Sequence, residues 1–162
     1  MKNNWLTIIA GFGIAFLVVA CGKDKPITNE SNEVLTKTDG VLYKVDTMNS
    51  RVEWKGYKVL KSDQTTHFGT ISFESGDITV KEGKLQSGKF VADINTLENI
   101  DLKDNQEMKS KLEGHLKSAD FFEVDKFPTA TYDITKVTEA KSGDYNTILD
   151  GNLTIKGITK PV

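Results

Sequence analysis

The chain has 162 residues, of which 21 are Lys or Arg and 23 are Asp or Glu, and its formal net charge is −2. A mildly acidic chain without a block of basic residues argues against nucleic acid as a partner. Roughly 120 residues follow the N-terminal region, which suits one compact domain and leaves no room for two.

An apolar run at the N-terminus ends in the only cysteine of the chain. As a helix of about 1.5 Å per residue, the run from Leu6 to Val19 falls well short of the roughly 30 Å hydrocarbon core of a bilayer. The small Ala20 before Cys21 is typical of a bacterial lipoprotein signal. We therefore predict a signal peptide over residues 1–20, cleavage before Cys21 and acylation of its thiol. The alternative is an uncleaved anchor with a free cysteine.

This interpretation predicts where the protein lies. It is expected to be exported and anchored to the cell envelope through the acylated Cys21, and Gly22 favours the outer membrane, facing the periplasm. The stretch 22–40 is polar and buries too little apolar surface to offset its ordering entropy. We expect residues 21–42 to be the lipidated cysteine with a flexible tether, and residues 43–162 to be the folded domain.

From Val41 onward, apolar and polar residues alternate in segments that are bounded by glycine and charged turns. The pattern predicts strands over 52–57, 68–74, 78–80, 85–97, 129–137 and 147–155. Because the connections between most of these strands are short, they favour an antiparallel meander over βαβ units.

One segment breaks the strand pattern. Between residues 104 and 117, apolar side chains recur every four positions from Met108 to Leu116, as on one face of a helix. Asp104 and Glu107 resemble a capping box, with aspartate as the cap. A helix between strands would plug one end of a curled sheet. The predicted fold is therefore all-β with one short helix, as a small antiparallel barrel.

Motifs for nucleophilic or nucleotide chemistry are missing from the sequence, which has no Gly-x-Ser-x-Gly, P-loop or Gly-x-Gly-x-x-Gly. We predict no enzyme and no metal. The alternative is a metal-dependent enzyme in which His67 and His115 act with Asp93 or Asp120. We favour imidazoles that hydrogen-bond backbone at a barrel end. Asp101 and Asp104 are expected to cap the helix.

Several motifs, taken in order, carry a family resemblance. They are Trp54–Tyr57, His67–Gly69, Gly88–Asp93, Leu112–Phe122, Phe127–Ala130 and Gly151–Gly157. From Tyr43 onward the chain resembles the YceI-like family of polyisoprenoid-binding, lipocalin-like proteins. The resemblance implies an eight-stranded antiparallel barrel whose apolar interior holds a long isoprenoid chain, often the tail of a quinone, in an exported protein.

The resemblance also decides how the aromatic residues are interpreted. On composition alone they would fill a solid core. In a lipocalin-like barrel they would line a tunnel, because Gly56, Ala92, Ala130 and Gly151 share faces with large residues and leave volume. The expected lining is Trp54, Phe68, Phe73, Phe90, Ala92, Ile94, Phe121, Phe122, Tyr132, Ile134, Leu153 and Ile155.

Further expectations concern the ends of the ligand and of the chain. Lys55, Lys58 or His67 would contact a polar head group. The family domain normally continues past the motif 159–162, so we expect the sequence to be truncated and the last strand to leave an exposed edge. Such an edge predicts poor solubility or a homodimer. A filled barrel that binds another protein is the remaining alternative.

Overall fold

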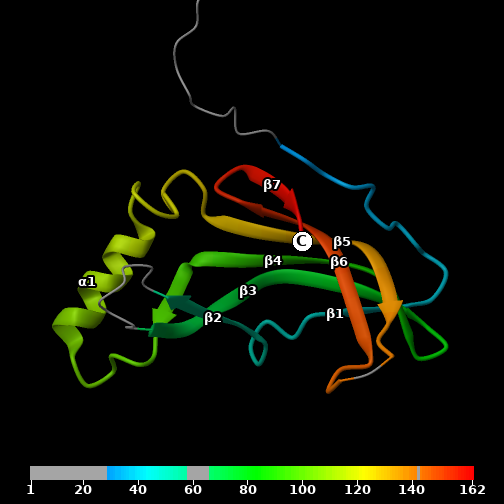
Figure 1. Ribbon diagram of the computed structural model, residues 1–162, viewed down its shortest axis with the longest axis horizontal. Coiled ribbons are helices and arrows are strands. Elements are labelled where there is room, and N and C mark those ends of the chain that lie inside the picture. The colour runs from blue at the N-terminus through cyan, green and yellow to red at the C-terminus, as the bar shows by residue number, and fades with distance from the viewer. Residues whose placement is uncertain (1–28, 58–65, 142) are drawn as a thin grey trace, which may run out of the picture.

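A computed structural model describes residues 29–57, 66–141 and 143–162. The predicted signal peptide, Cys21 and Lys58 lie outside these residues. The strands are β1 (Val41–Lys44), β2 (Arg51–Tyr57), β3 (Thr66–Lys81), β4 (Lys84–Asn99), β5 (Thr129–Glu139), β6 (Thr147–Ile155) and β7 (Ile158–Pro161). One helix, α1 (Gln106–Lys117), lies between β4 and β5 in the chain (Figure 1).

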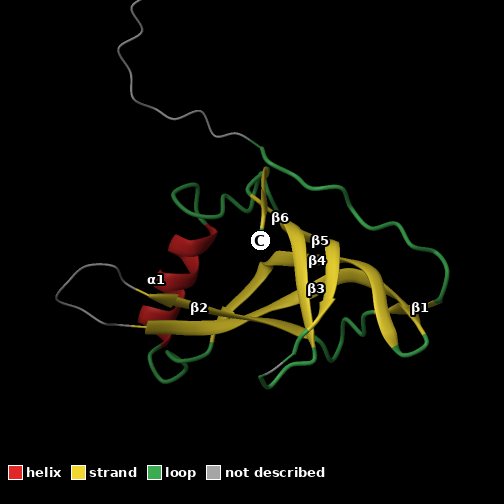
Figure 2. Cartoon of the chain, turned by 45° about the vertical axis from the view of Figure 1, so that its right-hand side comes forward, coloured by secondary structure: helices red, strands yellow, loops and turns green. Residues whose placement is uncertain are grey.

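All strands belong to one curled antiparallel sheet in the order β1-β3-β4-β5-β6-β7 (Figure 2). β2 pairs with the first half of β3, and β1 pairs with the second half of the same strand. The prediction of an antiparallel all-β fold with one short helix is confirmed. Among the described strands, however, no pairing of β7 with β1 or β2 closes the sheet into a barrel.

Tight turns join β3 to β4 and β6 to β7. The predicted strands 68–74 and 78–80 form one 16-residue strand, β3, which contains bulges and then turns into β4. Glu82 and Gly83 form this turn with φ of 52° and 74°, the positive values of a type I′ hairpin. Lys156 and Gly157 repeat it with φ of 51° and 71° between β6 and β7. We did not predict β7, although its Lys-Gly turn is a hairpin signal.

The helix forms where we predicted it, but a different residue caps it. The side chain of Asn105 accepts a hydrogen bond of 3.1 Å from the backbone N–H of Met108. The predicted cap, Asp104, lies one residue too early, because a cap accepts from an N–H two or three positions ahead. Glu107 still lies in the first turn, where its negative charge is favourable.

The main core lies at the end of the sheet that α1 covers. Ile71, Ile94, Leu97 and Val124 are buried together. Partly buried side chains pack against this cluster: Val52, Trp54, Ala92, Leu116, Phe122 and Ala130. The helix and the loop after it thus cover this end of the sheet, as predicted, through Leu116 and Phe122 rather than through the whole helix, which has no buried residue.

Residues 29–40, which we name the strap, differ from the expected free tether. The strap runs in extended form across the sheet and leads into β1 (Figure 1). Asn32 donates its backbone N–H to Asn152 over 2.8 Å, and Leu35 donates to the carbonyl of Ile134 over 3.0 Å. Composition alone missed this docking because the contacts of the strap are mainly polar.

Candidate functional site

Strand register divides the sheet into two faces. Phe73 pairs with Ala92, which pairs with Ala130, while Phe90 pairs with Tyr132 and so with Leu153. Side chains of directly paired residues share a face. We name the face of these residues the inner face, because Trp54, Ile71 and the core cluster also lie on it.

Nine of the predicted lining residues fall on the inner face by this register: Trp54, Phe73, Phe90, Ala92, Ile94, Tyr132, Ile134, Leu153 and Ile155. Only Ile94 and Ile134 are buried, at 3% and 0% exposure. The other seven are half-buried. The ring centroids of Phe73 and Phe90 lie 5.9 Å apart and the rings are tilted against each other. The middle of the inner face is an apolar surface whose side chains are only partly buried.

Phe68 and Phe121 do not lie where we predicted them. Phe68 pairs with Lys55, on the face opposite to Trp54, and 45% of it is exposed. The alternation of a strand dictates this, since Phe68 is one residue from Gly69, the partner of Trp54. Phe121 is 48% exposed and packs edge-on against Phe122, which alone of the pair reaches the core.

The small residues leave less space than predicted. A Cβ on Gly151 would lie 2.3 Å from the ring of Tyr132, so this ring fills the space above the glycine. The Tyr132 hydroxyl donates to the carbonyl of Leu149 over 3.3 Å, and burial raises the pKa of that hydroxyl. Gly56 differs, because a Cβ there would meet nothing closer than 3.9 Å.

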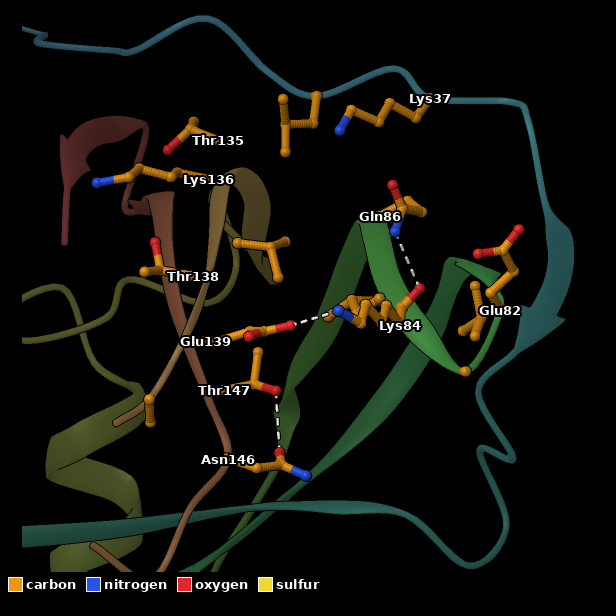
Figure 3. Close-up of a pocket in the computed structure, with 16 residues that line it drawn as sticks. Lys37, Glu82, Lys84, Gln86, Thr135, Lys136, Thr138, Glu139, Asn146 and Thr147 are labelled. Atoms are coloured by element: carbon orange, nitrogen blue, oxygen red, sulfur yellow. Dashed lines mark hydrogen bonds and ion pairs between the residues drawn. The ribbon is translucent and has the colours of Figure 1, made fainter. Parts of the chain in front are cut away.

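A cleft of about 910 Å³ opens at the end of the sheet remote from α1 (Figure 3). It forms because β4 and β5 pair only from Lys89–Asp93 to Thr129–Asp133 and separate beyond that ladder. Val80, Leu85 and Val137 contribute the apolar lining. By register these three continue the inner face, since Val80 pairs with Leu85 and Val137 pairs with Leu149.

Sequence reasoning missed these cleft residues. Bulges between Thr79 and Val80 and between Ile134 and Lys136 shift the alternation, so the period-two pattern no longer places Val137 with Ile134. Leu35 and Lys37 of the strap also line the cleft and were assigned to the tether. Their only sequence signal is a single apolar pair, Val34-Leu35, within a polar stretch.

Charged groups lie along the rim of the cleft. Lys84 and Glu139 reach each other across it, with Nζ and Oε1 2.5 Å apart (Figure 3). This hydrogen bond raises the pKa of Lys84 and lowers the pKa of Glu139. Both side chains are well exposed, so water screens the pair and it contributes little to stability. Lys37 extends over the opposite side of the same opening (Figure 3).

A polar network lies at the α1 end of the sheet. Asp101 accepts hydrogen bonds from His67 Nδ1 at 2.8 Å, from the N–H of Phe68 at 2.8 Å and from Asn99 at 2.6 Å. Asp101 therefore joins β3 to the end of β4 and does not cap the helix. His67 bonds a carboxylate, whereas we expected it to bond backbone.

The histidines are not gathered into a metal site. His115 lies 6.3 Å from Phe121 between ring centroids, while His67 is held by Asp101. Within the residues that the structure describes, no group of three or more His, Cys, Asp or Glu could hold a metal ion. Lys55, one of the predicted head-group contacts, lies on the outer face of the sheet and not on the inner face. Its Nζ atom lies over the ring of Tyr57, 5.4 Å from the ring centroid.

One buried donor on the inner face has no acceptor. The indole N–H of Trp54 is buried and has no hydrogen-bond partner in the described part of the chain. Such a group costs free energy unless a water or a ligand oxygen accepts its hydrogen.

None of the described helices is long and apolar enough to span a membrane.

The network around Asp101 predicts how stability depends on pH. Burial opposes ionisation of Asp101, but the hydrogen bonds from Phe68, His67 and Asn99 outweigh it and hold the pKa below the ordinary value. A lowered folded-state pKa stabilises the protein above the unfolded pKa, and this contribution disappears as the pH falls through the folded pKa. We expect Asp101→Asn to cost about 2 kcal/mol at neutral pH and progressively less in acid.

Urea unfolding across this pH range measures the difference between wild type and Asp101→Asn. The exposed neighbour Asp104, replaced by Asn, serves as the control and is expected to leave the curve nearly unchanged. A loss in Asp101→Asn that is the same at every pH would contradict the assignment.

The fold and this surface define a class of protein: a single curled antiparallel sheet with a short helix at one end and an open apolar inner face. The YceI-like domain matches residues 43–162, and the chain belongs to this family, as its motifs predicted. Protein YceI of Salmonella arizonae is 36% identical over an alignment of 126 residues that covers 74% of this chain and 58% of that protein. A UPF0312 protein of Shewanella baltica is 35% identical over 94 residues, 58% of this chain and 45% of the relative. The chain thus spans about half the length of the curated relatives it matches.

Proposed function

We propose that this protein is a non-enzymatic carrier or store for a long apolar lipid, of which a polyisoprenoid or the isoprenoid tail of a quinone is the best candidate. The observation that supports it is the apolar inner face, where Phe73, Phe90, Tyr132 and Leu153 stay half-buried. Soluble proteins rarely leave so contiguous an apolar surface without a partner for it. Membership of the YceI-like family points to the same class of ligand.

The energetics favour a long chain over a small ligand. Each buried CH₂ contributes about 0.8 kcal/mol, so one five-carbon unit contributes a few kcal/mol before the entropy of binding is subtracted. The inner face runs from the apolar core at α1 to the cleft at the far end, where Val80, Leu85 and Val137 continue it beneath a charged rim. Affinity would therefore come from the length of the tail. The indole N–H of Trp54 is a donor that a ligand oxygen could satisfy.

The N-terminal sequence completes this proposal. An acylated Cys21 would hold the protein on the envelope, in our proposal the outer membrane on its periplasmic side, within reach of the bilayer that supplies the lipid. A chain anchored in this way needs no catalytic step to withdraw and release its cargo. Self-association as a homodimer belongs to the same proposal and is tested by light scattering.

Extraction tests the proposal directly. The complete natural protein, purified from its own envelope, is extracted with organic solvent and the extract is analysed by mass spectrometry. We expect about one isoprenoid lipid per protein. In the variant Ala92→Trp, an indole would occupy the inner face beside Phe73, and we expect at least a tenfold loss of lipid.

Lys89→Trp is the matched control, since Lys89 lies three residues away on the same strand, on the opposite face and exposed to solvent. It should retain the wild-type amount of lipid. A lipid-free extract from folded wild-type protein would refute the proposal. Equal loss in both variants would show that the inner face is not the binding surface.

A further inference from the structure

The strap crosses the outer face of the sheet and meets five neighbouring strands in the order they have in the sheet. From its start to its end, it contacts β7, β6, β5, β4 and β3 through Glu30–Thr159, Asn32–Asn152, Leu35–Ile134, Lys37–Ser87 and Asp39–Lys81. It therefore lies across the strands rather than alongside one of them.

The outer face is built to receive the strap. Asn152 and Ser87 are polar residues at 4% and 6% exposure, and they point away from the inner face by register. Asn152 donates to the carbonyl of Asn32 over 2.7 Å and accepts its N–H, while Ser87 donates to the carbonyl of Lys37 over 3.1 Å. Buried polar groups need partners, and the strap supplies them here.

The middle of the strap bridges the gap between β4 and β5. The ladder of these strands ends at Lys89 and Asp133. Leu35 donates to the carbonyl of Ile134, the next residue of β5, and Lys37 bonds Ser87, on the separated part of β4. The gap that opens into the cleft is thus spanned by three residues of the strap. Leu35 and Lys37 are at the same time lining residues of the cleft.

We infer that the strap is a removable wall of the lipid site, and that its release opens a side entrance between β4 and β5 through which an apolar chain enters and leaves. This inference rests on the proposed function. The strap suits the role because its contacts are mostly single hydrogen bonds near the surface, and of its apolar side chains only Leu35 is partly covered. Elements held in this way open more readily than the core.

Release would also change the reach of the lipid anchor. The first docked residue, Asn29, lies eight positions after Cys21 and accepts a hydrogen bond from the N–H of Thr159. Fully extended, eight residues span at most about 28 Å, whereas the twenty from Cys21 to Val41 span about 70 Å. The same event would thus open the cleft and extend the possible distance between sheet and membrane.

The first test loosens the strap in the full chain. Leu35→Ser removes the only partly covered apolar side chain of the strap, and Val34→Ser, its 38% exposed neighbour, is the matched control. We expect Leu35→Ser to accelerate hydrogen exchange of the amides of Asn32 and Leu35 at least tenfold. Dissociation of a fluorescent anthraniloyl ester of geranylgeraniol should accelerate by a similar factor, and Val34→Ser should stay within twofold of wild type for both rates.

The second test locks the strap. A disulfide between Asn32→Cys and Asn152→Cys, or between Asp39→Cys and Lys81→Cys at the other end, joins residues that already contact each other. We expect either disulfide to slow uptake of the same probe at least tenfold and reduction to restore it. Unchanged uptake in both oxidised variants would overturn the strap as a gate while leaving the lipid site intact. If neither the wild type nor any variant binds the probe, the proposed function fails as well. In the first test, hydrogen exchange in Leu35→Ser at the wild-type rate would show that Leu35 does not hold the strap.

Discussion

Replacing Gly69 by alanine is expected to destabilise the protein by about 3 kcal/mol, which is a large loss for one methyl group. A Cβ at this position would lie 1.9 Å from the carbonyl oxygen of Glu98 and 2.8 Å from the indole of Trp54. The first of these atoms belongs to the backbone of β4, at the place where the β3–β4 register shifts. Relief therefore requires that β4 move as a whole, because no side chain can rotate away.

Gly114→Ala is the matched control for this variant. Gly114 lies inside α1, and a Cβ there would meet nothing within 4 Å. Alanine in a helix interior is favoured over glycine, so we expect a gain of about 0.5–1 kcal/mol. Urea unfolding of both variants measures the two changes. If Gly69→Ala were as stable as wild type, the close approach of β3 to β4 would be refuted.

Replacing Asn99 by leucine is the second change with a large expected effect, again a loss of about 3 kcal/mol. Asn99 is fully buried. Its amide donates to the carbonyl of Phe68 at 3.1 Å and to Asp101 at 2.6 Å, and its oxygen accepts from the N–H of Leu102 at 2.9 Å. Leucine has a similar size but removes all three hydrogen bonds. The N–H of Leu102 loses its acceptor, and Asp101 and the carbonyl of Phe68 each lose one of their donors; lost hydrogen bonds of buried polar groups are costly.

Asn95→Leu is the control for the network. Asn95 lies on the same strand and is exposed, and its side chain donates a hydrogen bond to the nearby Asp93. We expect its stability to stay within about 0.5 kcal/mol of wild type. The distinguishing result is acid unfolding. Since Asn99 helps to hold the pKa of Asp101 down, Asn99→Leu should lose part of the pH dependence described for Asp101. Equal effects of the two substitutions would argue against a buried network.

Local patterns predicted most strands well because a half-buried strand repeats every two residues. The strand over 147–155 matches β6 to the residue, and the helix from Met108 to Leu116 lies within α1. The same periodicity placed nine of the lining residues on one face. It failed at bulges, where one extra residue reverses the alternation, and so Val137 was overlooked at the cleft.

The network and the strap could not have been predicted in this way. Asp101 was expected to cap a helix, since acids near a helix start usually do, but its partners in β3 lie more than thirty residues away in the chain. The strap has no apolar period because it binds through backbone groups and buried amides. Asn32 and Asn152 are separated by 120 residues, a distance at which local composition carries no signal.

By itself, the sequence determined the family, the antiparallel sheet, the helix and the apolar face, because these depend on short-range alternation and on motifs within single segments. Only the tertiary structure decided that β4 and β5 separate into a cleft and that residues 29–40 lie across the gap. These features depend on which distant groups meet once the sheet has curled, and it is the curl that brings a polar N-terminal stretch over unpaired backbone.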